Sequence, residues 1–166
     1  MEKEFENILQ EHNAIIYKVA RAYSYYEYRD LYQEILMQLW RSFDRFEGKS
    51  KVSTWIYRVA LNTAITYKNR RSQNHLDLEK VPELKDESEK SESGAHKIKI
   101  AILYKCINQL KPDDRALIIL QLEGYDYEEI SEIIGITKNL VGVKLNRIKY
   151  RIQTLFKKYN YGKLEH

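Results

Sequence analysis

The sequence predicts an all-α protein made of two small helical domains, joined by a flexible acidic linker. Three observations support this prediction. Gly (6) and Pro (2) are scarce among the 166 residues, which disfavours turn-rich β structure. Apolar residues recur at helical spacing towards both ends of the chain, and no segment shows the alternation expected of a β-strand. Residues 73–97 are rich in Ser, Glu and Lys and have almost no large apolar side chain after Leu84, which is typical of a linker.

Apolar spacing divides each domain into helices. In the N-terminal domain, residues 1–72, we expect helices at residues 4–23, 29–43 and 52–71. In the C-terminal domain, residues 98–160, we expect helices at residues 98–110, 115–123, 127–134 and 138–159. Residues 161–166 form a tail, and its last three residues, Leu164-Glu165-His166, resemble the start of an expression tag, so no function is expected of them.

Charge is distributed unevenly along the chain, whose net charge is +4. Residues 113–132 contain seven acids and one Arg, whereas residues 138–163 contain eight Lys or Arg and no acid. A run of like charge is often only a solvated face. A basic helix placed directly after an acidic one is better explained by a surface that faces phosphate. The C-terminal domain is therefore expected to bind nucleic acid.

The residue inventory argues against an enzyme, a metal site and a cofactor. The single cysteine, Cys106, excludes an internal disulfide and a Cys-cluster zinc site, and the four His are too scattered to bind a metal. The sequence has neither a glycine-rich phosphate loop nor an H-E-x-x-H motif. The acidic start MEKEFENILQ has no apolar signal segment, and no stretch is long enough to span a membrane. We therefore expect a cytoplasmic protein without membrane insertion.

The stretch DYEEISEIIGITKNLVGVKLNRIKYRI, residues 126–152, predicts a helix-turn-helix: a short helix, a three-residue turn with a glycine, and a longer helix. Val141, Leu145, Ile148 and Ile152 would dock the longer helix on the domain. Groups able to contact base edges and phosphates remain outside. The predicted DNA-binding residues are Thr137, which would also cap the helix, and Lys138, Asn139, Lys144, Asn146, Arg147, Lys149 and Arg151. A plain helical hairpin, the alternative, explains neither the turn nor the charge switch.

The stretch WIYRVALNTAITYKNRR, residues 55–71, contains a ridge of hydrogen-bonding side chains on a helix that is otherwise largely apolar. Arg58, Asn62, Thr66 and Asn69 lie at i, i+4, i+8 and i+11, and therefore on one face. Asn and Thr are indifferent helix formers, because they compete with the backbone for hydrogen bonds. Their recurrence on one face indicates a function.

Basic and aromatic residues surround this ridge. Residues 48–76 contain six Lys or Arg and no acid, with Tyr57 and Tyr67 interleaved. Such a combination suits single-stranded nucleic acid, whose unstacked bases offer flat faces and Watson–Crick edges. The pattern alone has low specificity. For Trp55 a place in the core is the stronger interpretation, and for Tyr57 core and stacking platform are equally good ones.

Two long stretches resemble bacterial extracytoplasmic-function (ECF) sigma factors of RNA polymerase. RDLYQEILMQLWRSFDRFEGKSKVSTWIYRVALNTAI is similar to their region 2, the promoter-melting domain. LKPDDRALIILQLEGYDYEEISEIIGITKNLVGVKLNRIKYRI is similar to their region 4, which binds the −35 element. The resemblance covers about residues 8–72 and 98–158, and the two motifs in this order and at this spacing are highly specific. It implies a subunit that binds core polymerase, recognises the −35 and −10 elements and melts DNA.

The resemblance also implies roles for individual residues. Asp30, Gln33 and Glu34 match the D-L-x-Q-E segment that docks on the coiled coil of the polymerase β′ subunit. Tyr57, Arg58 and Asn62 match the W-L-Y-R-I-A-x-N helix, which engages the melted −10 element. The rest of the ridge and the end of that helix would face the displaced strand and its phosphates: Thr66, Lys68, Asn69, Arg70 and Arg71.

In the C-terminal half, residues 137–149 match the recognition helix for the −35 major groove, and residues 110–122 match the part that meets the β flap of the polymerase. An anti-sigma factor is also an implied partner. The sequence departs from the family pattern at Gly142 and Val143, where relatives often carry Lys and Ser. A Gly inside a helix costs about 1 kcal/mol relative to Ala. It would either permit a close backbone approach or leave a weak contact.

Two other classes of protein compete with this interpretation. A stand-alone helix-turn-helix regulator would bind duplex DNA without polymerase, but it has no use for the surface of Asp30, Gln33 and Glu34 or for the acid-free ridge. A helical adaptor that binds only protein would not explain the long basic run at the C-terminus. The sigma factor explains both halves of the chain.

Overall fold

The computed structural model describes residues 1–73 and 92–161, with the backbone alone for Glu92, Ser93 and Tyr161. It confirms the all-α prediction, because the described residues form seven helices and no strand. The helices are α1 (Glu2–Tyr23), α2 (Tyr28–Phe43), α3 (Val52–Gln73), α4 (Glu92–Asn108), α5 (Pro112–Leu122), α6 (Tyr127–Ile134) and α7 (Lys138–Tyr161). Most of the predicted linker and most of the tail lie outside the described residues. None of these helices is both long and apolar enough to cross a membrane.

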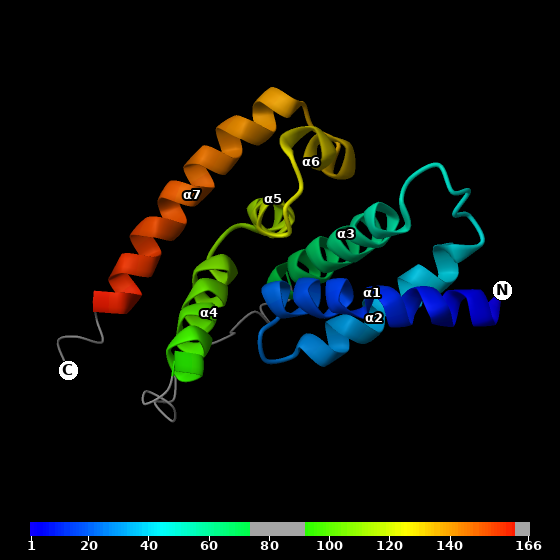
Figure 1. Ribbon diagram of the computed structural model, residues 1–166, viewed down its shortest axis with the longest axis horizontal. Coiled ribbons are helices and arrows are strands. Elements are labelled where there is room, and N and C mark those ends of the chain that lie inside the picture. The colour runs from blue at the N-terminus through cyan, green and yellow to red at the C-terminus, as the bar shows by residue number, and fades with distance from the viewer. Residues whose placement is uncertain (74–91, 162–166) are drawn as a thin grey trace.

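The N-terminal domain is a bundle of α1, α2 and α3, each packed against the other two (Figure 1). Its core consists of the apolar positions at helical spacing, because these are the side chains that the bundle removes from water. Its fully buried aliphatic side chains include Ile16, Val19, Leu31, Ile35, Leu39 and Ile56. At one end, the ring of Trp55 stacks on Phe46 with centroids 4.9 Å apart. Trp55 is partly buried and packs against the core, which agrees with the interpretation that the sequence favoured.

The C-terminal domain packs α7 against α4, α5 and α6. Its first helix begins at Glu92, so the predicted start at residue 98 is wrong. Residues 92–97 carry no large apolar side chain, and apolar spacing therefore could not detect this part of the helix. Once the amphipathic part of α4 is docked, each added residue gains a backbone hydrogen bond, which extends the helix even across Ser93 and Gly94.

The predicted helix-turn-helix is confirmed at α6 and α7, and its ends are fixed by local hydrogen bonds. Asp126 and Glu129 form a reciprocal capping box at the start of α6, with N···O distances of 2.8 and 3.0 Å. Gly135 ends α6 with φ of 84°, a conformation that favours glycine. The Oγ1 of Thr137 accepts a hydrogen bond from the backbone N–H of Leu140 at 3.2 Å, which caps α7 as expected.

Arg115 connects the two domains. Its guanidinium is buried (5% exposed) and donates to the carbonyls of Leu110 at 2.9 Å and Asn108 at 2.6 Å, at the end of α4. On its other side it donates to the carbonyls of Ala22 at 3.5 Å and Tyr23 at 3.4 Å, at the end of α1. One cation therefore donates hydrogen bonds to the C-terminal ends of two helices, one from each domain. Its positive charge is also favourable there, because the C-terminal end of a helix dipole is partly negative.

Replacing Arg115 by Met should destabilise the protein. The substitution keeps the apolar stem but leaves the buried carbonyls of Asn108 and Leu110 without this donor, so we expect the free energy of unfolding to fall by about 2–3 kcal/mol. Urea denaturation followed by circular dichroism measures the change. Arg41→Met, at an exposed position of α2, is the matched control. Equal unfolding midpoints for the two variants would contradict the role given to Arg115.

Candidate nucleic-acid interface

The ridge predicted from sequence lies on the surface of α3. Arg58, Asn62, Thr66 and Asn69 are all exposed, and the opposite face of the helix is buried in the bundle. The prediction that these four side chains share an exposed face is therefore confirmed. Their amide, hydroxyl and guanidinium groups form a row of hydrogen-bond donors and acceptors that suits base edges and phosphates.

Two residues of the predicted −10 surface are buried instead. The side chain of Tyr57 is 1% exposed, and its ring meets that of Tyr125 edge-on, with centroids 5.4 Å apart. Burial raises the pKa of the Tyr57 phenol far above its ordinary value, and the nearby Glu123 carboxylate raises it further. Lys68 is 6% exposed and does not present its charge on the surface. Helical spacing placed Tyr57 and Lys68 near the edge of the exposed face of α3. Whether a residue at that edge is buried depends on the elements that pack beside it.

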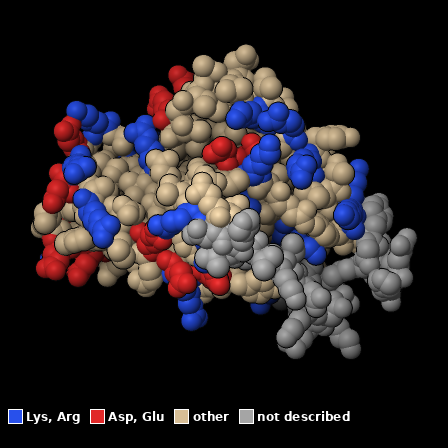
Figure 2. Space-filling view, turned by 180° about the vertical axis from the view of Figure 1, so that it is seen from behind, with Lys and Arg blue, Asp and Glu red and all other residues tan. Residues whose placement is uncertain are grey.

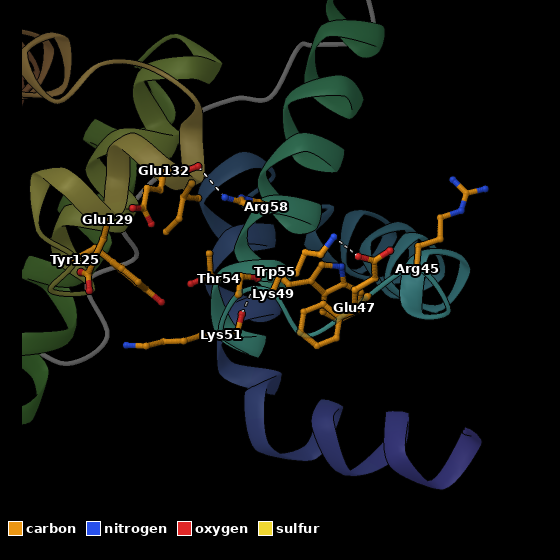
Figure 3. Close-up of a pocket in the computed structure, with 13 residues that line it drawn as sticks. Arg45, Glu47, Lys49, Lys51, Thr54, Trp55, Arg58, Tyr125, Glu129 and Glu132 are labelled. Carbon is orange, nitrogen blue, oxygen red and sulfur yellow. Dashed lines mark hydrogen bonds and ion pairs between the residues drawn. The ribbon is translucent and has the colours of Figure 1, made fainter.

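The start of the ridge contacts the C-terminal domain. Arg58 donates a hydrogen bond at 3.0 Å to the backbone carbonyl of Glu132 in α6 (Figure 3). Beside this bond is an open hollow of about 440 Å³ between the domains. The N-terminal domain contributes mainly cations to its lining, and α6 contributes carboxylates: Arg45, Lys49, Lys51 and Arg58, with Glu47 paired to Lys49, and Glu129 and Glu132.

The end of α3 pairs with α2. Arg70 forms an ion pair with Glu34 at 2.7 Å, and Arg71 forms one with Glu27 at 2.5 Å. Glu34 belongs to the predicted polymerase-binding set, so the structure joins a residue of that set to one of the predicted −10 set. The other two polymerase-binding candidates, Asp30 and Gln33, are exposed on α2.

The predicted −35 residues lie along α7. Val141, Leu145 and Ile148 are buried and dock the helix, as expected. Thr137, Lys138, Asn139, Asn146, Arg147 and Arg151 are exposed, and Lys144 and Lys149 are partly exposed. Figure 2 shows Lys and Arg side chains following α7 along the surface. Such a row of cations suits a polyanion that runs along the helix.

Side chains of α7 divide between two flanks of the helix. Lys144, Arg147 and Arg151 line an open hollow beside the start of α5, which also contains the carboxylates of Asp113 and Asp114. The predicted residues Lys138, Asn139, Asn146 and Lys149 are not among those that line this hollow. One group can therefore contact a phosphate backbone while the other faces bases in a groove.

Contacts between the domains include residues that the sequence did not single out. Tyr125 covers Tyr57, and Lys18 of α1 forms an ion pair with Glu123 at 2.9 Å. Each contact joins positions far apart in the chain, so no local spacing could predict it.

In the part of the chain described, no group of three His, Cys, Asp or Glu could hold a metal ion. Burial raises the pKa of the Cys106 thiol to about 11.

Comparisons with known proteins match both halves of the chain. The family model Sigma-70 region 2 matches residues 8–74, and Sigma-70 region 4 matches residues 100–152. The ECF RNA polymerase sigma-E factors of Haemophilus influenzae and Escherichia coli are 30% and 31% identical. Their matches cover 75% and 74% of this chain and 71% and 70% of those proteins, respectively. The ECF sigma factor SigG of Mycobacterium tuberculosis is 24% identical over 80% of this chain, but only 42% of SigG is covered.

A solved structure shares the fold. It is the sigma factor RpoE in complex with the anti-sigma factor NepR from Bartonella quintana, with a TM-score of 0.73 at 23% identity. The likeness covers 93% of this chain and 98% of the RpoE chain. Fold, surfaces and matched families thus define a two-domain sigma factor with regions 2 and 4.

The chain belongs to the ECF group of RNA polymerase sigma factors. Proteins of this family bind core RNA polymerase and promoter DNA and initiate transcription, and they act as regulators without catalysing a reaction. The stand-alone regulator considered above is not favoured, because the N-terminal domain is a region 2.

Replacing Tyr125 by Asp should separate the two domains. The substitution removes the ring that meets Tyr57 edge-on and places a second carboxylate close to Glu123, so an aromatic contact is lost and like charges repel. We expect a larger radius of gyration in small-angle X-ray scattering, with helical content unchanged. Tyr150→Asp, at a position of α7 that is 74% exposed, is the matched control and should change neither. An unchanged radius for Tyr125→Asp would mean that this contact does not hold the domains together.

Proposed function

We propose that this sigma factor reads its promoter with α3 and α7, from two domains that bind DNA in different states. Residues 1–72 act as region 2 on the melted −10 element, and residues 98–160 act as region 4 on the duplex −35 element. The observation that carries the proposal is the exposed row of Arg58, Asn62, Thr66 and Asn69 on a helix that is otherwise packed. Nothing in the bundle requires these polar groups, whereas an unstacked DNA strand can use all of them.

At the −10 element, Asn62 captures a flipped base, with Arg58, Thr66 and Asn69 beside it on the displaced strand. An amide both donates and accepts hydrogen bonds, so it can distinguish bases by their Watson–Crick edges. Arg70 and Arg71 hold phosphates once they leave Glu34 and Glu27. Both pairs are partly exposed, and exposed pairs contribute little stability, so this exchange costs little.

At the −35 element, α7 enters the major groove. Lys138, Asn139 and Asn146 face bases, with Thr137 at the start of the helix and Lys149 beside them. Lys144, Arg147 and Arg151 contact the phosphate backbone. The support for this division is their separation onto two flanks of α7, together with the absence of any acid from residues 138–161.

Protein partners bind elsewhere on the molecule. Asp30, Gln33 and Glu34 dock on the coiled coil of the polymerase β′ subunit, and residues 110–122 meet the β flap. An anti-sigma factor is a further partner, as for the related RpoE, whose structure was solved with NepR. The contacts of Tyr57 and Arg58 with the C-terminal domain mean that the domains separate before the −10 surface is complete. These steps take place in the cytoplasm, where the polymerase acts.

Asn62→Ala tests the −10 assignment. Loss of a base hydrogen bond should slow open-complex formation at a cognate promoter by about tenfold, equivalent to about 1.4 kcal/mol. Binding to core polymerase, measured by co-elution, should be unchanged. Permanganate reactivity of unpaired thymines reports promoter opening directly. Asn160→Ala, exposed near the end of α7, serves as the control. If Asn62→Ala opens the promoter at the normal rate, Asn62 does not contact the melted strand.

Lys144→Ala and Arg147→Ala test the −35 assignment. Each removes one phosphate contact, so the slope of log affinity against log salt concentration should become shallower by roughly 1. Fluorescence anisotropy with a −35 duplex over a series of salt concentrations measures this slope. Lys99→Ala, at an exposed position of α4, should leave it unchanged. If all variants gave identical slopes, Lys144 and Arg147 would not contact the phosphates of the −35 duplex.

A further inference from the structure

Tyr127 of α6 packs against α7 at Gly142, where α7 has no side chain. A Cβ built on Gly142 would lie 3.2 Å from Cε2 of the Tyr127 ring and 3.5 Å from Cδ2. The shorter distance is less than a relaxed contact between carbon atoms, which is about 3.5–4.0 Å. The ring edge therefore occupies the space in which a side chain at position 142 would begin. This close approach explains why α7 uses a poor helix former in its interior.

Gly142 lies beside the predicted base-reading residues of α7. Lys138 and Asn146 are one turn before and after it, and both are exposed. Tyr127 is only partly buried, and the ring atom nearest to position 142 is Cε2, which is next to the carbon that bears the hydroxyl. It is not among the residues that line the hollow between the domains, where Glu129 and Glu132 of α6 face α3. The α6 helix thus offers its carboxylates to the N-terminal domain and a tyrosine to the recognition helix.

We propose that Tyr127 is a specificity-determining residue for the −35 element, and that its phenol provides the hydrogen-bonding group that position 142 lacks. The inference rests on the proposed role of α7 in the major groove. A phenol can donate to N7 or O6 of guanine or O4 of thymine, and it can accept from the amino group of adenine or cytosine. A ring held against the helix backbone loses little freedom on binding, which makes such a contact selective.

The first test compares the full chain bound to core polymerase with its Tyr127→Phe variant. Phe keeps the ring against Gly142 and removes only the hydroxyl. Binding to a pool of duplexes randomised over the −35 element, followed by sequencing of the bound fraction, gives the base preference at each position. We expect the base preference at one or two adjacent positions of the −35 element to fall by about three- to tenfold. The base preference at the other positions, and the slope of log affinity against log salt concentration, should be unchanged.

A second test joins Tyr127 and Gly142 in a double-mutant cycle. In the normal background, Gly142→Ala pushes the ring aside and should alter the same base positions as Tyr127→Phe. In a Tyr127→Ala background the space is empty, so Gly142→Ala should raise the unfolding temperature through better helix propensity and leave base preference unchanged. A purely structural packing role would affect the unfolding temperature in both backgrounds without changing which bases are preferred.

The outcomes separate the inference from the proposed function. If Lys144→Ala weakens duplex binding but Tyr127→Phe leaves every base preference as it was, Tyr127 is only a packing residue and the inference is wrong. A uniform loss of affinity across all sequences would indicate a phosphate contact and would also overturn it. If neither Lys144→Ala nor Tyr127→Phe has any effect, α7 does not bind the −35 element and both proposals fail.

Discussion

The arrangement of the two domains depends on the hydrogen-bonding needs of helix ends. Helices α1 and α4 both end where α5 begins, and their last carbonyls have no partner within their own helices. The Arg115 guanidinium supplies donors to both ends, and the phenol of Tyr23 donates to the carbonyl of Pro112 at 2.6 Å. A buried cation that donates to these carbonyls is costly to withdraw. The C-terminal domain is therefore held on the N-terminal bundle at a defined place, and α3 meets α6 as a consequence.

Sequence reasoning predicted the features that depend on local periodicity. The helix-turn-helix, the buried positions of α7 and the exposed ridge of α3 all follow from apolar spacing over one or two elements. Burial of Tyr57 and Lys68 did not follow, because both lie near the edge of the exposed face of α3. Whether such a residue is covered depends on a neighbour distant in sequence, such as Tyr125. The early start of α4 was missed because its first turn has no apolar side chain to signal it.

Gly142 shows how the structure decides between alternatives that the sequence leaves open. A glycine in a recognition helix is compatible with a close backbone approach or with a weak contact. The distance to Tyr127 shows a close approach within the protein itself, since a larger residue at this position would require the ring to move. The information lies in a pair of residues on different helices, and neither is unusual when considered alone.

Several cations at the proposed DNA-binding surface and between the domains are bonded to acceptors of the protein itself. Arg58 is bonded to a carbonyl of α6, and Lys18 to Glu123 of the other domain. Arg70 is paired with Glu34 of α2, and Arg71 with Glu27, just before α2. Each of these contacts is exposed or partly exposed, so each contributes little stability and can be exchanged for a phosphate at small cost. Under the proposed function, DNA would compete for Arg58, Arg70 and Arg71, and polymerase would compete for Glu34. Because Arg70 and Glu34 are paired, engagement of Glu34 by polymerase would free Arg70 for the strand, which couples the two binding events through one ion pair.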